Sequence, residues 1–124
     1  MADDFKYDVF LSHNSKDKPA VENIARLLRD VYNLKAWLDK WNLVPGEAWQ
    51  DALEDALDES QTFAVFLGPS GIGSWENEEM RTAIEDRVQD PLRRVIPVLL
   101  PGAPDNKDLK PPRFLRRATW VDFR

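Results

Sequence analysis

Short apolar runs alternate along the chain with longer segments in which apolar residues recur at helical spacing. The runs lie at 7–11, 36–38, 63–67, 95–100 and 120–121. Runs of this length, separated by helical patterns, are typical of strands in βαβ units. The alternation therefore predicts an α/β domain built on a parallel sheet.

Three segments between these runs are predicted to be helical. Apolar residues follow the helical period at 21–31 and 49–57, as in helices that cover a sheet with one face. The third segment, from Trp75 to about Arg87, is more polar at its start and has Ser74 as an N-cap candidate. Its first turn is therefore expected to face solvent or a cleft.

The runs at 63–67 and 95–100 are apolar almost throughout, which indicates a sheet covered on both faces. We predict a flavodoxin-like fold, with a five-stranded parallel sheet of order 2-1-3-4-5 and helices on both faces. Pro97 is an objection to the fourth strand, because proline has no N–H to donate to a neighbouring strand. Four prolines and a glycine between Pro101 and Arg117 predict that the last crossover is irregular rather than a full helix.

Length and charge narrow the class of protein. The 124 residues fit one domain, and a net charge of -5 makes a nucleic acid or an anionic membrane a poor partner. No apolar run is long enough for a membrane helix and the first residues do not resemble a signal peptide, so the cytoplasm is expected. The chain stops at Arg124 without a helix to cover that side of the sheet, so we expect residues 1–124 to be the N-terminal part of a longer multidomain protein.

Several kinds of site are excluded by composition and motif. There is no cysteine and only one histidine, His13, which argues against a metal centre or a Ser-His-Asp triad. Gly71 and Gly73 form only part of a dinucleotide fingerprint, and no P-loop motif is present. Leu67-Gly68-Pro69 stands where a phospho-acceptor receiver domain would need an aspartate, and no magnesium pocket is supported.

Ligands of open α/β sheets bind at the carboxyl ends of the strands, beside the point where the strand order reverses. Segments 12–15, 39–47, 68–74 and the start of the third helix are predicted to meet there. The polar segment Ser12-His13-Asn14-Ser15 has two interpretations. Its amides and hydroxyls could hold phosphate or ribose oxygens, or it could simply cap the following helix.

The loop at 39–46 carries Trp41 and Leu43 beside a Pro45-Gly46 turn. Apolar residues on a loop often mark a contact site, although both side chains could instead fold back onto the domain.

Trp75 and Glu79 stand four residues apart and so share one face of the third predicted helix. A carboxylate beside an indole in a cleft could hold sugar hydroxyls and stabilise positive charge that develops at the anomeric carbon. Alternatively, Glu76, Glu78 and Glu79 merely complement the helix dipole while Trp75 fills a gap in the core.

Taken together, these motifs resemble the TIR domain, the Toll/interleukin receptor fold, in its bacterial form. Tyr7–His13 resembles the opening strand motif, and Trp37–Asp39 with Leu43–Gly46 resembles the second motif and the BB loop. Ser70–Glu79 is similar to the S-x-W-x-x-x-E region, and Trp120–Phe123 resembles the closing motif. Each motif alone is degenerate, but their combination in this order spans nearly the whole chain.

The resemblance implies cleavage of the nicotinamide-ribose bond of NAD+, which is a substrate here and not a cofactor. Glu79 takes the place of the catalytic carboxylate, and Trp75 that of the aromatic residue against the nicotinamide end. The substrate-binding positions that it implies are Ser12, His13, Asp39, Trp41, Ser74 and Trp75. The BB-loop interface with a neighbouring TIR domain is implied to comprise Trp41, Asn42, Leu43, Val44, Pro45 and Gly46.

This resemblance leads to one main hypothesis and two alternatives. The main one is an NAD+ glycohydrolase, weak as an isolated domain, that is activated by TIR self-association in bacterial anti-phage immunity and controlled by a C-terminal sensor domain. The alternatives are a non-catalytic signalling module that acts through the BB loop and a nucleotide sensor that does not cleave. Glu76 stands where many TIR domains have cysteine and adds negative charge near the site. The sequence leaves linear and cyclic ADP-ribose both open as products.

Overall fold

The computed structural model describes residues 5–38, 45–46, 48–69, 78–105, 111 and 113–124. Its strands are β1 (Tyr7–Ser12), β2 (Ala36–Trp37), β3 (Ser60–Leu67), β4 (Arg94–Leu99) and β5 (Val121–Asp122). Its helices are the 3-10 turn η1 (Ser15–Asp17), α1 (Lys18–Asp30), α3 (Trp49–Asp58), α4 (Glu78–Arg87) and α6 (Arg113–Arg116). All five predicted strands are therefore present, and β3 begins three residues earlier than predicted.

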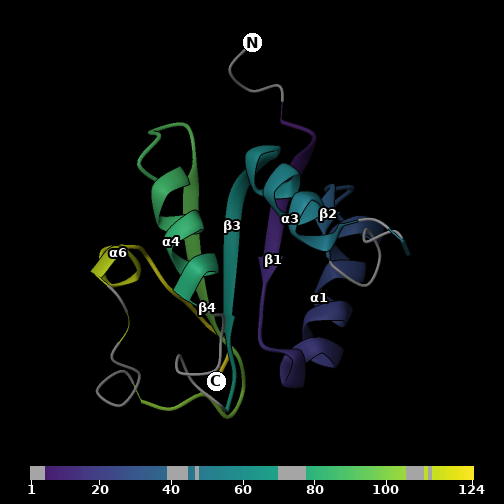
Figure 1. Cartoon of the computed structure of the whole chain (residues 1–124). Helices are drawn as coiled ribbons and strands as arrows, with labels where there is room; N and C mark the ends of the chain where they lie inside the picture. The colour runs from purple at the N-terminus through teal and green to yellow at the C-terminus, as the bar shows by residue number, and fades with distance from the viewer. Residues whose placement is uncertain (1–4, 39–44, 47, 70–77, 106–110, 112) are drawn as a thin grey trace.

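The strands form one parallel sheet in the order β2-β1-β3-β4-β5 (Figure 1). β1 lies between β2 and β3, with Phe10 beside Trp37 on one side and beside Phe63 on the other. The predicted flavodoxin-like order is confirmed. The order reverses between β1 and β3, because the chain moves outward from β1 to β2 and then returns past β1 to β3.

This reversal decides which face each helix covers. Parallel crossovers are right-handed, so a crossover that runs in the opposite direction places its helix on the opposite face of the sheet. α1 therefore packs on one face, with Val21 and Ala25 buried against Leu11 and Phe66. Helices α3, α4 and α6 pack on the other face, because the three later crossovers run toward β5. The prediction of helices on both faces is confirmed.

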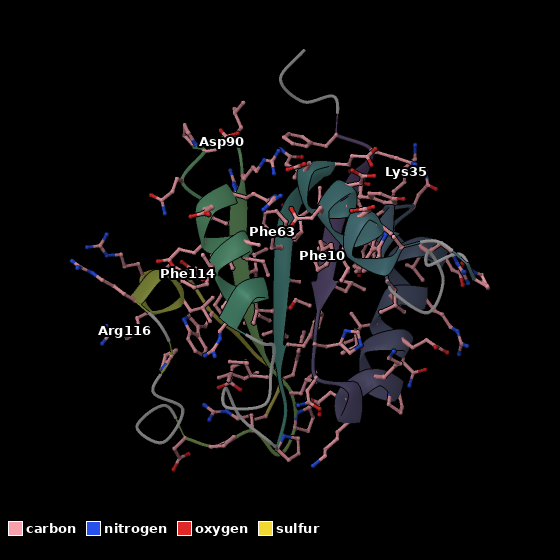
Figure 2. All side chains as sticks on the ribbon, viewed as in Figure 1. Phe10, Lys35, Phe63, Asp90, Phe114 and Arg116 are labelled. Atoms are coloured by element: carbon pink, nitrogen blue, oxygen red, sulfur yellow. The ribbon has the colours of Figure 1, made fainter. Side chains whose placement is uncertain are left out.

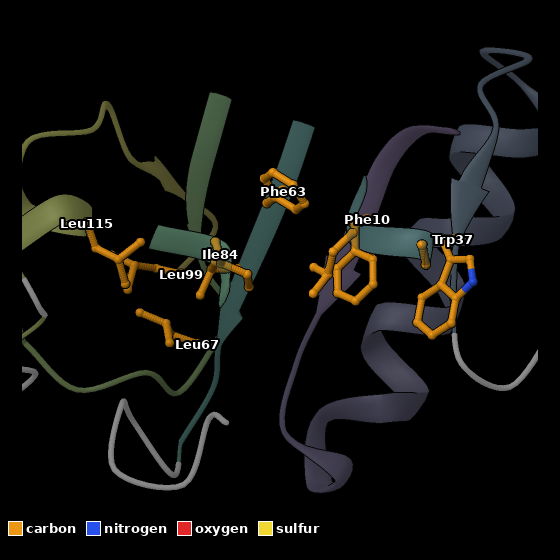
Figure 3. Packing of buried hydrophobic residues seen from close by; sticks show 10 residues of the cluster. Phe10, Trp37, Phe63, Leu67, Ile84, Leu99 and Leu115 are labelled. Atoms are coloured by element: carbon orange, nitrogen blue, oxygen red, sulfur yellow. The ribbon is translucent and has the colours of Figure 1, made fainter. Parts of the chain in front are cut away.

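The larger part of the core lies between the sheet and these three helices (Figure 3). Phe10 stacks on Trp37 with ring centroids 4.7 Å apart and tilts against Phe63 at 6.2 Å. Ile84 of α4 and Leu115 of α6 are fully buried in the same cluster. A second, smaller cluster lies between the sheet and α1 and includes Leu11 and Phe66. Alternate residues of a strand enter the two clusters, so the strands appear in the sequence as continuous apolar runs.

Pro97 lies inside β4, opposite Val65 of β3. The amide of Leu100 donates to Leu67 of β3, and successive N–H groups of a strand point to alternate sides. Position 97 therefore faces the β5 side, where pairing begins only at Val98. The missing N–H of proline falls where β5 does not reach, so the strand tolerates it.

The last crossover contains the four-residue helix α6 and a turn at Pro101-Gly102, which confirms the predicted irregular connection for the residues described. Trp120 secures this crossover, since its Nε1 donates to the Leu115 carbonyl at 2.7 Å. Among the described helices, none combines the length and the apolar character that crossing a membrane requires.

Candidate functional site

The carboxyl ends of β1 and β3 and the first turns of α1 and α4 lie at the same edge of the sheet, the lower edge in Figure 1. Lys35 and Asp90, which precede β2 and β4, mark the opposite edge (Figure 2). α1 and α4 cover opposite faces, so their N-termini approach the β3 end from two sides. The 12–15 segment and the first described turn of α4 thus lie at the same edge of the sheet, while the predicted start of the third helix at Trp75 lies outside the described residues.

The segment after β1 turns directly into α1. Ser12 is fully buried and lies opposite Val65, while Nδ1 of the half-buried His13 is 3.3 Å from the Leu11 carbonyl oxygen. Asn14 Oδ1 accepts the Lys16 amide at 2.8 Å, and the Asn14 carbonyl accepts the Asp17 amide at 2.9 Å. Asn14 thus closes the 3-10 turn η1, which leads into α1.

Asp17 and Gly68 form a close contact that the sequence patterns did not predict. Gly68 follows the last residue of β3, and a Cβ built there would overlap the carboxylate of Asp17. Asp17 is 8% exposed and precedes α1, but its side chain makes no capping hydrogen bond to that helix. The signal in the sequence is an aspartate one residue ahead of Lys18-Pro19, together with a glycine at a strand end.

The backbone of Glu79 lies in the first turn of α4, and its side chain is outside the described part of the chain. It stands one turn before Ala83, which packs against the core, and Ile84 next to Ala83 is fully buried. Position 79 is therefore on the flank of the helix, at the edge of the face that covers the sheet.

α4 is tied to α3 by an arginine at its C-terminal end. Arg87 Nη2 lies 2.8 Å from Glu54 Oε2, and Arg87 Nε donates to Asp58 Oδ1 at 3.0 Å. Arg93 donates to the carbonyls of Leu57 and Asp58 at 3.0 and 2.8 Å. The Arg87 contacts hold the helix that carries Glu79 against α3, and Arg93 ties the C-terminal end of α3 to the segment that enters β4.

The remaining predicted site residues divide between two groups. Pro45 and Gly46 form an exposed turn in which Gly46 has φ 92°, a conformation that favours glycine. The others lie outside the described residues; they are Asp39, Trp41, Asn42, Leu43, Val44, Ser74 and Trp75. Their roles stay predictions.

A groove of about 480 Å³ lies elsewhere, on the α1 face of the sheet. Its floor includes Phe66, Ile96 and Val98, and its walls include Leu28 of α1 and Phe123 after β5. It exists because only the first crossover crosses this face. None of the described residues that line it is basic, so they offer nothing to neutralise the phosphates of a dinucleotide.

The chemistry available at the carboxyl edge is that of acceptors, backbone donors and the ammonium groups of Lys16 and Lys18, which flank Asp17 in the sequence. Asp17 supplies a nearly buried carboxylate, and the start of α1 supplies N–H groups and the positive end of a helix dipole. Among the described residues, no group of three or more His, Asp and Glu side chains could hold a metal ion.

Comparison with known proteins identifies the family. The sequence model of the TIR domain matches residues 9–124. A search of curated proteins finds no match.

Two solved structures illustrate the similarity in fold. The TIR domain of the Toll-related receptor TRR-2 from Hydra magnipapillata is 20% identical with a TM-score of 0.70, over 95% of this chain and 85% of that one. A metazoan TIR-STING receptor from C. gigas, solved in complex with 2′,3′-cGAMP, is 23% identical with a TM-score of 0.71 over 95% of this chain. The present chain spans 35% of that receptor's length. With the family model matching nearly its whole length and the flavodoxin-like sheet in the predicted order, the chain belongs to the TIR domain family.

Proposed function

We propose that this TIR domain is an NAD+ glycohydrolase in which Glu79 is the catalytic residue. The observation that carries the proposal is the meeting of the β1 end and the first turns of α1 and α4 at one edge, next to the reversal of strand order. Open α/β sheets bind their ligands at this place. The position of Glu79 in the first turn of α4 brings its backbone to that edge.

The reaction needs one carboxylate and no general acid. The bond between ribose C1′ and the nicotinamide nitrogen breaks, and its electron pair leaves with the nitrogen, so the pyridinium departs as neutral nicotinamide. Glu79 would hold the ribose hydroxyls and stabilise the positive charge that develops at C1′. Water then adds its oxygen to C1′ and releases one proton, which gives ADP-ribose. Attack by an adenine nitrogen instead would give a cyclic isomer.

The other predicted residues would complete the pocket around the dinucleotide. Ser12 and His13 would line its ribose and phosphate side, and Ser74 and Trp75 its nicotinamide end. Asp39 and Trp41 would close it from the BB loop. The exposed Pro45-Gly46 turn supports a role of this loop in contact with a second TIR domain. We propose that the complete pocket forms only in such an assembly.

We further propose that the domain acts in the cytoplasm as the effector part of a longer immune protein. A sensor domain C-terminal to residue 124 would bring TIR domains together in response to phage. The TIR-STING receptor, whose structure contains 2′,3′-cGAMP, supports this arrangement as an example in which a similar fold is part of a longer receptor.

Tethering the domain to a multimeric carrier tests the proposal. Clustering raises the effective concentration of neighbouring domains, so nicotinamide release per domain should rise by about tenfold or more over the untethered domain at equal total concentration. Chromatography of nicotinamide and ADP-ribose measures it. Self-association without any release of nicotinamide would contradict the proposed enzymatic activity. It would favour the alternative of a non-catalytic signalling module that acts through the BB loop.

A further inference from the structure

The carboxylate of Asp17 has no structural task in the described part of the chain. Asn14 makes the turn into α1 through its side chain and carbonyl, so Asp17 does not cap that helix. No described residue forms an ion pair or a side-chain hydrogen bond with the Asp17 carboxylate. In the described residues, the fully buried side-chain atoms without a hydrogen-bond partner are Nε of Arg81 and Nε of Arg93. The Asp17 oxygens are not among them, so they keep contact with solvent, and a ligand can reach them.

The position of this carboxylate points to a ligand. It lies against Gly68, so it stands where β3 ends beside β1, at the reversal of strand order. Any side chain at position 68 would occupy its space. The glycine thus leaves room for a carboxylate at the edge where open sheets bind ligands.

The charge of Asp17 selects which part of a ligand can lie there. The helix N-terminus and the neighbouring Lys16 and Lys18 favour phosphate near this segment. A ligand group in direct contact with the Asp17 carboxylate instead meets an acceptor, which binds hydroxyl groups and repels a phosphate. Asp17 precedes α1 and Glu79 lies at the start of α4, so the two residues flank the β3 end from opposite faces of the sheet. NAD+ has two riboses, and the proposed function assigns one of them to Glu79.

We propose that the Asp17 carboxylate accepts hydrogen bonds from the hydroxyl groups of the adenosine ribose. This contact would make the site select NAD+ over NADP+. This inference rests on the proposed function. NADP+ carries a phosphate on the 2′ oxygen of that ribose, so it loses a hydrogen bond to Asp17 and gains a repulsion. An acidic residue that contacts this hydroxyl excludes NADP+ in dinucleotide-binding folds of a different kind for the same reason.

The test compares kcat/KM for NAD+ and NADP+ in the tethered domain, with calorimetric binding of both dinucleotides as a second readout. The wild type should prefer NAD+ by about tenfold or more, since a hydrogen bond to a charged group contributes on that scale. Asp17→Asn should reduce the preference to within about threefold, mainly by changing KM and Kd. The asparagine side chain can accept a hydrogen bond from a hydroxyl group and can also donate one to a phosphate. Asp30→Asn is the matched control, since it removes the same charge from the exposed far end of α1 and should keep the preference.

Gly68→Ala provides a second variant that leaves the charge in place. The three atoms nearest to its methyl group all belong to the end of the Asp17 side chain, which can turn away, so the fold should survive. We expect the preference for NAD+ to fall here too. Retention of the preference in both Asp17→Asn and Gly68→Ala would overturn the inference, as would equal use of both dinucleotides by the wild type.

The two proposals fail in different ways. Cleavage of NAD+ without selection against NADP+ would remove only the role of Asp17. Binding of NAD+ that is selective but unproductive would support Asp17 and contradict the glycohydrolase. A wild-type domain that binds neither dinucleotide when tethered would overturn both.

Discussion

Replacing Phe63 by alanine is expected to lower the free energy of unfolding by about 3–5 kcal/mol, the range for truncating a buried aromatic side chain. Phe63 has no exposed surface and sits in the middle of the sheet, between Phe10 of β1 and Val95 of β4. Its ring contacts Phe10 under the helices of the larger core cluster. The free energy of unfolding of a small domain is roughly 5–15 kcal/mol, so this substitution would remove a large share of it. Urea denaturation followed by circular dichroism measures the change.

Phe123→Ala is the matched control, because it removes the same side chain from a position that is 55% exposed. We expect its effect to stay within about 0.5 kcal/mol, as for most surface substitutions. Equal losses in the two variants would show that the larger cluster does not hold the sheet and its helices together as described.

Glu79→Gln is expected to reduce nicotinamide release by the tethered domain by about 10²- to 10³-fold, the cost of losing one preorganised electrostatic group. Glutamine keeps the length of the side chain and its helix propensity, so α4 should form as before. The lost charge interaction with the helix N-terminus costs about 0.3–1 kcal/mol, which is too little to unfold the domain. Steady-state release at saturating NAD+ reports the loss.

Glu78→Gln serves as the control for this variant, since the neighbouring residue in the same turn of α4 carries the same charge. Its release rate should stay within about threefold of the wild type, because a change in charge near the helix start alone has a small effect. A Glu79→Gln domain that is folded, assembled and fully active would remove Glu79 from catalysis.

The fold could be predicted closely because its signals are local. Each strand of the parallel sheet is marked by an apolar run, and each of the helices α1 and α3 by apolar residues at helical spacing. The buried face of α1 is therefore visible in Val21 and Ala25, and that of α3 in Ala56 and Leu57. Pro97 was the one conflicting signal. Its tolerance depends on the length of β5, which is a property of the assembled sheet and cannot be seen in the residues around position 97.

The site could be predicted less completely, because contacts between distant segments leave no periodic trace. Ser12 and the start of α4 were expected at one edge from topology alone. The contact between Asp17 and Gly68 joins residues 51 positions apart, and it follows from how closely the end of η1 approaches the end of β3. An aspartate ahead of a helix is ordinarily interpreted as its cap, and here Asn14 makes the turn instead, so the sequence alone did not single out Asp17.

Both proposals depend on NAD+ binding at the carboxyl edge, between the starts of α1 and α4. Amide chemical shifts of the tethered Glu79→Gln domain, recorded by NMR during titration with NAD+, test this placement most directly because this variant is expected to consume the ligand only slowly. We predict that the largest shifts fall on the 12–17 segment and on Gly68. Shifts confined to the apolar groove, at Leu28, Ile96 and Val98, or no shifts at millimolar NAD+, would contradict it.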